Sequence, residues 1–216
     1  MTSYIEVGLL SDATFSFGEG TAGEVDVEIA HDEYGLPFLP GRTLRGLLRE
    51  SWLAMALHFP EYGAPAREVL GPAGDLTPGG VSRLRIDDAR LGEEVREWAR
   101  FATRRKGNAV SPHDLLLAFT DVRRQTARDR STGSPRGETL RASRVALRGL
   151  ELRASIRPEG FDKTHREVLA LCCLGVRHAG LGRNRGRGHV RLRLVDGDHD
   201  LTSEAAERLL SEVEER

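Results

Sequence analysis

The sequence predicts an α+β protein in which helices cover one face of an antiparallel sheet and an arm interrupts the chain. Three observations lead to this class: some segments alternate apolar and polar residues, others have apolar residues at helical spacing, and one long segment is almost without apolar residues. Without the insertions the order is strand, helix, strand, strand, helix, strand, which is the ferredoxin-like (RRM-like) arrangement. The 216 residues fit a single domain, 1–216, with an insertion at 59–118, an arm at about 119–144 and an acidic C-terminal helix at 203–215.

Period-two alternation predicts the strands, apolar residues three and four apart predict the helices, and Gly and Pro mark the breaks. The first expected elements are a strand at Ser3–Phe17 with a bulge at Leu9–Leu10, a break at Gly18–Gly23, a short β segment at Val25–Ile29, a loop at Asp32–Pro40, and a helix that Thr43 caps and that runs to about His58. They are followed by a loop-rich stretch at Phe59–Gly80 with a short helix near Arg67–Leu70, a strand at Ser82–Leu91, and helices at Glu93–Ala102 and Pro112–Phe119.

The second half begins with Thr120–Thr139, in which Val122 is almost the only apolar residue and five arginines occur. We expect this segment to be an extended, mobile arm that projects from the body. The elements expected after it are a strand at Leu140–Ile156, a helix at Asp162–His178, a glycine-rich loop, a strand at His189–Val195 and an amphipathic helix at Ser203–Glu215.

Composition excludes several classes of protein. No stretch approaches the roughly 18 consecutive apolar residues of a membrane span, and the N-terminus lacks the basic start and apolar run of a signal peptide. The only cysteines, Cys172 and Cys173, are adjacent within an apolar run, so we expect core residues in a reducing, cytoplasmic setting without zinc or disulfides. Trp52 is likewise expected in the core.

The net charge of −1 hides an uneven distribution. Residues 121–194 contain 18 Lys and Arg against 7 Asp and Glu, whereas the tail 195–216 contains 2 against 8. Arginine presents a planar fork that fits phosphate oxygens and also stacks on bases. A block of this kind favours a polyanionic partner, although a solvated basic face is the alternative.

Two segments combine glycine with arginine. In the first, GLPFLPGRTLRGLLRE (Gly35–Glu50), the free N–H groups at the helix start and Thr43 would form an anion site, with Arg42, Arg45 and Arg49 along one helical face. The interior Gly46 disfavours the helix by about 1 kcal/mol, which suggests close packing at that position. An ordinary capped helix with solvated arginines is the alternative reading.

The second segment, GLGRNRGRGHVRLRL (Gly180–Leu194), alternates glycines with arginines between a predicted helix and a predicted strand. Glycines allow a backbone to approach a phosphate and arginines neutralise it, so we expect RNA binding here. A chance arginine-rich turn is the alternative. The residues concerned are Gly182, Arg183, Arg185, Gly186, Arg187 and Gly188.

These two segments, in this order and near the two ends of the chain, resemble the RAMP superfamily of CRISPR-associated proteins. The segment Phe119–Ile156 between them looks like the arm-and-strand region of type III subunits. The resemblance implies an RRM-like core with a protruding β-thumb, antiviral function, and assembly with other RAMP subunits and with small and large effector subunits along a guide RNA (crRNA) that pairs with target RNA. It also implies that Arg42, Thr43, Arg45 and Arg49 contact guide phosphates. The second segment would line or support the same groove through Arg183, Arg185 and Arg187.

Subunits of this family often cut target RNA with one aspartate in the loop after the first strand. The match through GLPFLP assigns that role to Asp26, with Asp32 as second choice, although the usual proline soon after the aspartate is missing. Mg²⁺ or another divalent cation would be the cofactor, with no metal ligand identified beyond Asp26. The alternative for Asp26 is a polar residue on a short strand, flanked by Glu24 and Glu28.

Four functions therefore stay open. The first is a guide-binding backbone subunit of a type III effector, with or without target cleavage, and the second is a purely structural RAMP subunit of the same complex. The third is a stand-alone RAMP endoribonuclease that processes precursor guide RNA, for which His31 is a candidate general acid or base. The fourth is an RNA-binding protein outside CRISPR.

Overall fold

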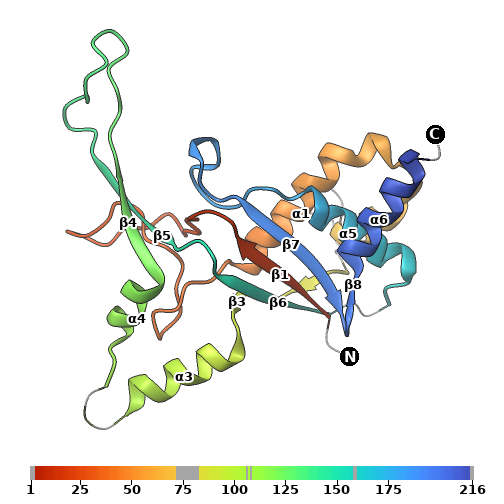
Figure 1. Cartoon of the computed structure of the whole chain (residues 1–216), viewed down its shortest axis with the longest axis horizontal. Coiled ribbons are helices and arrows are strands. Elements are labelled where there is room, and N and C mark those ends of the chain that lie inside the picture. The colour runs from red at the N-terminus through yellow and green to blue at the C-terminus, as the bar shows by residue number, and fades with distance from the viewer. Residues whose placement is uncertain (1–2, 72–82, 106, 108, 158–159, 215–216) are drawn as a thin grey trace.

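The structure is a computed structural model that describes residues 3–71, 83–105, 107, 109–157 and 160–214. It combines an antiparallel sheet with packed helices and a projecting hairpin (Figure 1), so the predicted α+β class is confirmed. The finer ferredoxin-like assignment stays a prediction. Among the described residues, no helix has the length and apolar character that a membrane crossing requires.

The main sheet has the strand order β2-β6-β1-β7-β8, and β3 pairs with β6 beside β2. All of these pairings are antiparallel, with Ile5 opposite Ala154 on one side and Leu194 on the other. The strands are β1 (Ser3–Leu9), β2 (Arg85–Ile86), β3 (Arg90–Leu91), β6 (Glu151–Arg157), β7 (Val190–Asp196) and β8 (His199–Asp200).

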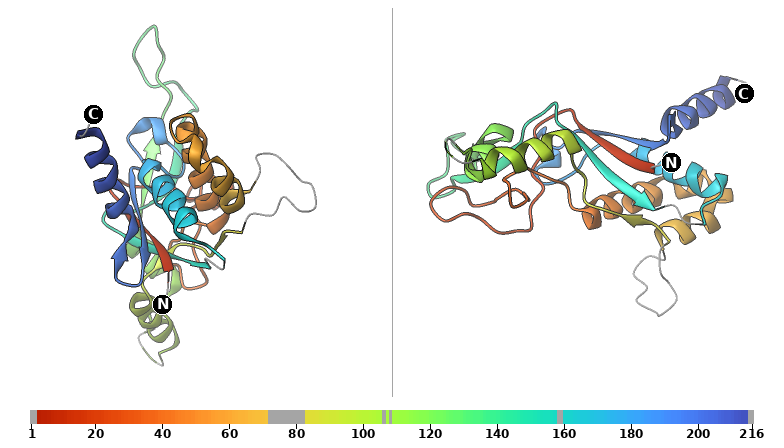
Figure 2. Two further views of the ribbon diagram at one scale, coloured as in Figure 1. Left: turned by 90° about the vertical axis from the view of Figure 1, so that its right-hand side faces the viewer. Right: turned by 90° about the horizontal axis from the view of Figure 1, so that it is seen from below.

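Helices bury one face of this sheet. In β6 the residues alternate strictly between exposed and buried, and Leu152, Ala154 and Ile156 point into the core. Helices α1 and α5 pack against each other, and α5 and α6 pack on β7 (Figure 2). The helices are α1 (Gly41–Met55), α2 (Gly63–Leu70), α3 (Glu93–Arg104), α4 (Pro112–Phe119), α5 (Lys163–Gly175) and α6 (Leu201–Glu214), with short 3-10 turns at Ala56–His58, Pro60–Tyr62 and Arg183–Arg185.

The opposite face of the sheet is open and carries charged side chains. Glu6 lies in the middle of it, opposite Arg153 of β6 and Arg193 of β7, and forms ion pairs with both. Glu6 therefore neutralises, within the fold, two arginines of the basic segment 121–194, which we call the basic block.

The arm is a β-hairpin and not an unpaired segment. Strands β4 (Thr120–Gln125) and β5 (Arg141–Ala146) form a separate antiparallel sheet, in register from Thr120 opposite Ala146 to Gln125 opposite Arg141. The hairpin projects away from the main sheet (Figure 1). Its base is anchored because Val145 and Ala146 are buried, which compensates for the low stability of an isolated two-stranded ribbon.

Four predicted strands have other limits in the structure. The first strand ends at Leu9, and Val25–Ile29 forms only isolated bridges, from Val25 to Thr21 and from Val27 to Ser143. Leu140–Ile156 is two strands separated by a turn in which Gly149 has a φ of +86°. The expected strand Ser82–Leu91 is the two short strands β2 and β3.

Residue 82 of that expected strand lies outside the described residues, as do residues 72–80 of the loop-rich stretch and residue 215 of the C-terminal helix. Because β2 and β3 pair with β6, part of the range 59–118 belongs to the main sheet. The predicted helices near Arg67–Leu70, at Glu93–Ala102 and at Pro112–Phe119 correspond to α2, α3 and α4.

Candidate RNA interface

A groove of about 1410 Å³ lies between the arm and the loop that precedes β7; we call it the arm groove. Both of its sides carry arginine, and its base is formed by short polar and apolar side chains. The lining includes Gly182, Arg183, Arg185 and Arg187 from the loop, Gln125, Arg128 and Arg141 from the arm, Thr14, Val27 and Ser143 from the base, and Glu50 from α1. Of the sequence-predicted residues, the arm groove thus brings together one glycine and all three arginines of the second segment.

Glycine is required at several points of the loop. Gly182 and Gly186 have φ values of +76° and +73° and flank the 3-10 turn Arg183–Arg185. At Gly188, with a φ of +70°, a Cβ would lie 2.0 Å from the carbonyl oxygen of Ala179. The glycines therefore fix the course of the loop and with it the positions of the arginines.

The three loop arginines differ in their partners. Arg183 forms an ion pair of 3.1 Å with Glu50 of α1, and Arg185 donates from Nη1 to the Gln125 side chain at 2.9 Å. Burial, and then repulsion from the guanidinium groups of Arg123 and Arg185, lowers the pKa of Arg187 from its ordinary value, although Asp12 opposes this. An anion bound beside Arg187 would stabilise the charged form of its guanidinium. This position therefore suits a phosphate.

The start of α1 differs from the expected anion site. Pro40 and not Thr43 is the capping residue, and no side chain of the segment caps the helix. The N–H of Gly41 donates to the Asp88 carboxylate at 2.9 Å, so the chain itself supplies the anion at this N-terminus. The prediction that Thr43 caps the helix was wrong, whereas a phosphate contact by Thr43 stays a prediction.

Close packing occurs at Gly41 and not at Gly46. A Cβ on Gly41 would lie 2.7 Å from the carbonyl oxygen of Ile86, whereas a Cβ on Gly46 would meet nothing within 4 Å. Gly46 lies on the exposed side of α1, so the expectation of a packed neighbour there was wrong.

The arginines of α1 lie outside the arm groove. Arg42 lines a second groove, of about 710 Å³, beside the start of α1, and Arg49 donates to the carbonyl oxygen of Gly71 at 2.5 Å. Burial, followed by repulsion from Arg49 and Arg85, lowers the pKa of Arg45. The two predicted segments therefore do not line one common groove. The basic group around Arg45 is a separate candidate contact for phosphate.

Asp26 lies at the base of the arm, next to the groove residue Val27. Its backbone N–H donates to the Ala142 carbonyl at 2.9 Å, and its Oδ2 accepts the Ala142 N–H at 2.7 Å. The side chain is exposed, and its Oδ1 has no hydrogen-bond partner among the described residues. Asp26 thus presents one free carboxylate oxygen from a backbone position that β5 fixes.

The neighbouring acids are both used by one buried arginine. Arg144 of β5 is 2% exposed and contacts Glu28 through Nε at 2.8 Å and Glu24 through Nη2 at 2.7 Å. Its backbone N–H also donates to the Val27 carbonyl at 3.0 Å. Of the three acids at 24, 26 and 28, Asp26 is therefore the one that Arg144 does not neutralise.

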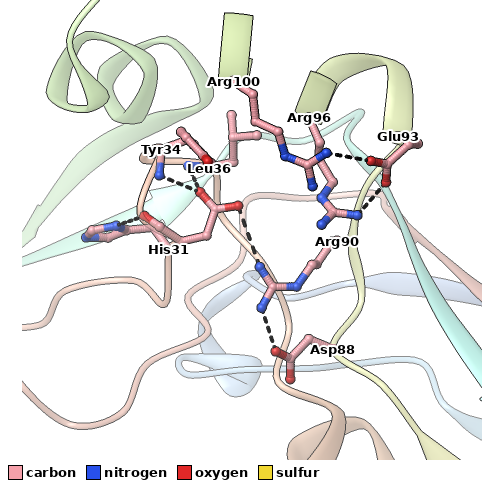
Figure 3. A network of polar contacts seen from close by, with 9 residues as sticks. His31, Tyr34, Leu36, Asp88, Arg90, Glu93, Arg96 and Arg100 are labelled. Atoms are coloured by element: carbon pink, nitrogen blue, oxygen red, sulfur yellow. Dashed lines mark hydrogen bonds and ion pairs between the residues drawn. The ribbon is translucent and has the colours of Figure 1, made fainter. Parts of the chain in front are cut away.

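Asp32 is held in a structural network. Its Oδ1 accepts the backbone N–H groups of Tyr34 and Leu36, both at 3.0 Å, and its Oδ2 lies 3.6 Å from Arg90. Figure 3 shows this region with His31, whose Nδ1 contacts the Asp32 carbonyl at 3.0 Å. These contacts favour a loop-stabilising role for Asp32, and they leave Asp26 the better candidate for chemistry.

A divalent cation would depend on groups outside the chain. Among the described residues, no three His, Cys, Asp or Glu side chains are grouped so that they could hold a metal ion. Mg²⁺ commonly binds through one or two carboxylates, water and substrate phosphates, so Asp26 could contribute one ligand and RNA the others. The predicted core residues Cys172, Cys173 and Trp52 are buried, as expected.

Three contributors to this region were not predicted. Asp88, Arg144 and Phe17 each act through contacts with residues distant in sequence, so a pass along the chain gives no signal for them.

Comparison with known proteins shows the fold and the family of the chain. A cryo-EM structure described as the type III-B Cmr-beta bound to cognate target RNA matches with a TM-score of 0.64 and 13% identity, over 90% of this chain and 97% of that chain. The apo state of Cmr-beta matches with a TM-score of 0.64 and 12% identity, over 91% and 98%. No curated protein sequence matches significantly. The model of the RAMP superfamily matches residues 14–191, most of the sequence, and the chain therefore belongs to the RAMP superfamily.

Proposed function

We propose that this protein is a guide-RNA-binding backbone subunit of a type III CRISPR effector and that Asp26 cuts the paired target RNA. The observation that carries the proposal is the arm groove, in which the loop arginines and the arm enclose a path beside Asp26. The solved structures of this fold, described as type III-B Cmr-beta with and without cognate target RNA, support the same assignment.

Binding would rest on the unneutralised arginines of the groove. Arg185 and Arg187 form no ion pair with a carboxylate among the described residues, and Arg141 faces them from the arm. Contacts of this kind go to phosphates and carry no sequence information, which suits a subunit that must accept any guide. Arg45 and Arg42 would add contacts near the start of α1.

Cleavage would use the free oxygen of Asp26. A 2′-hydroxyl that attacks its own phosphate loses a proton, and the Asp26 carboxylate can accept a hydrogen bond from that hydroxyl and orient it. The step forms the bond from phosphorus to the 2′ oxygen and breaks the bond to the 5′ oxygen, which gives a 2′,3′-cyclic phosphate. The proton lost by the 2′-hydroxyl passes to water, and the departing 5′ oxygen takes one up from water to leave as a hydroxyl. A divalent cation, when bound between RNA and Asp26, would supply charge stabilisation to the phosphate. The Ala142 N–H would hold the other carboxylate oxygen and fix the orientation of the side chain.

The test is cleavage of complementary RNA by the assembled effector with Mg²⁺. Asp26→Asn keeps the hydrogen bond from Ala142 but removes the charge, and Glu138→Gln removes an exposed carboxylate that lines the same groove. We expect regularly spaced cuts that Asp26→Asn abolishes and Glu138→Gln preserves. Cuts that persist in Asp26→Asn would contradict the assignment.

Two other outcomes identify the remaining functions. If the wild-type complex binds guide and target but never cuts, the chain is a structural subunit. This structural role is the second candidate function, because the hydrogen bond from the Ala142 N–H to Asp26 Oδ2 can also be explained as a contact that only holds the arm. If the isolated chain cuts precursor guide RNA without metal, and His31→Ala abolishes that activity, the chain is a processing endoribonuclease.

A further inference from the structure

Phe17 is a large apolar side chain that remains exposed although its position is fixed. Its exposed fraction is 53%, and it lies in the loop after β1, outside any helix or strand. The other exposed aromatic residues, Trp98 and Phe101, occur on the surface of α3. Single exposed apolar side chains are common on protein surfaces, so what distinguishes Phe17 is the set of contacts that fixes its ring.

A buried partner fixes one edge of the ring. The ring centroids of Phe17 and Phe38 are 6.1 Å apart and the planes meet at 58°. Phe38 is 8% exposed, and the guanidinium of Arg90 lies 4.5 Å from its centroid. Arg90 in turn pairs with Asp88 at 2.8 Å (Figure 3), so the base of this aromatic pair is tied to the sheet and to the start of α1.

The guanidinium group of an arginine lies over the ring. The guanidinium carbon of Arg42 lies 5.1 Å from the Phe17 centroid, within the range of a cation–π contact. The backbone is held as well, because the Gly18 N–H donates to the Ser16 hydroxyl at 2.9 Å. The result is a positioned aromatic surface with a cation beside it.

This combination fits one ligand class. Single-stranded RNA is bound by aromatic rings on which bases stack, together with cations that neutralise the adjacent phosphate. We propose that Phe17 is a stacking platform for a base of the guide RNA, with Arg42 on the phosphate of the same nucleotide. The inference rests on the proposed function, to which it adds a base contact that needs no particular sequence.

The test uses the full chain and guide RNAs in which 2-aminopurine replaces one base at a time, because stacking quenches the fluorescence of this analogue. We expect quenching at defined positions with wild type and with Phe17→Tyr, and its loss with Phe17→Ala. Binding should weaken about 5- to 150-fold in Phe17→Ala, the range for loss of one base stack. Phe101→Ala, which removes a ring of α3 that is 67% exposed, should change neither measurement.

The outcomes separate this inference from the proposed function. If the wild-type chain fails to bind guide RNA at all, the proposed function fails and the platform with it. If wild type binds, but Phe17→Ala retains both quenching and affinity, the platform alone is wrong. If Phe17→Ala binds guide RNA normally but no longer assembles with other subunits, the ring is a protein contact and the proposal is overturned. Phe17→Tyr guards against misfolding, because it keeps the ring.

Discussion

Arg144 offers the sharpest test of how the arm is attached to the body. Its guanidinium is buried at the base of the arm, where it pairs with Glu24 and Glu28 of the segment that carries Asp26. Nη1 of Arg144 is the buried side-chain polar atom that lacks a hydrogen-bond partner within the described residues. The substitution Arg144→Met removes the charge and keeps most of the volume.

The size of the effect follows from what the substitution leaves behind. Breaking a buried ion pair from one side costs about 3–5 kcal/mol, because the other charge stays without a partner. Glu28, whose side chain is 14% exposed, loses its cation and keeps only the hydrogen bonds from the Thr21 hydroxyl and the Ile29 N–H, whereas Glu24 is 46% exposed and regains water. We therefore expect Arg144→Met to lower the free energy of unfolding by about 3 kcal/mol, the lower end of that range.

Urea unfolding measures this loss, and two further variants identify its cause. Arg124→Met, which removes an exposed arginine from the neighbouring strand β4, should change the free energy of unfolding by no more than about 0.5 kcal/mol. Adding Glu28→Gln to Arg144→Met should recover about 1–2 kcal/mol, because it removes the uncompensated charge. A double variant no more stable than Arg144→Met would refute the ion-pair reasoning.

Three other local features give testable predictions. Gly188→Ala should destabilise the protein by about 1–3 kcal/mol more than Gly133→Ala in thermal unfolding, since both have a φ of +70° but only the Gly188 Cβ would meet backbone. Burial raises the pKa of Cys172 to about 12, so at pH 8 only ~10⁻⁴ of this thiol is ionised and iodoacetamide should label it only after unfolding. The hydrogen bond from the His165 backbone N–H lowers the pKa of Asp162 in the folded state. The stability that this cap contributes is therefore fully present above the ordinary pKa of aspartate, and it is lost as the pH falls through the lower pKa of the folded state. Asp162→Asn should keep the cap and reduce that acid sensitivity in denaturation at successive pH values.

The elements that the sequence predicted well are those whose limits depend on neighbouring residues. Helix α4 begins and ends as expected because Ser111 and Asp114 form a capping box directly before the apolar turn. Helix α5 begins where Asp162 caps it, with the same reciprocal pattern to His165. Strand β7 has every second residue buried from Val190 to Leu194, so its period alone identifies it.

The features that were missed depend on residues far apart in the chain. Asp88 caps α1 across 47 positions, and no local pattern marks an aspartate that will meet a distant helix. Val25–Ile29 has the composition of a strand, but the contacts of Glu24 and Glu28 with Arg144 hold it as a bent segment. Tertiary contacts therefore override local preference at the base of the arm.

Contacts of this kind reduce the number of arginines in the basic block that are available to RNA. The excess of +11 in this block is the difference between 18 basic and 7 acidic residues in 121–194. Arg123, Arg144 and Arg193 of this block pair inside the fold with acids from the N-terminal part of the chain. The groove arginines without an ion pair among the described residues are Arg128, Arg141, Arg185 and Arg187, and Arg42 and Arg45 can be added from α1.

These six arginines predict the salt dependence of guide binding. Each phosphate contact with a single strand lowers the slope of log K against log salt by about 0.7, so six contacts give a slope of about −4, whereas an excess of eleven would give about −8. Titrations of one guide RNA across a range of salt concentrations measure this slope. A value near −8 would mean that further arginines of residues 121–194, beyond these six, also contact the guide RNA.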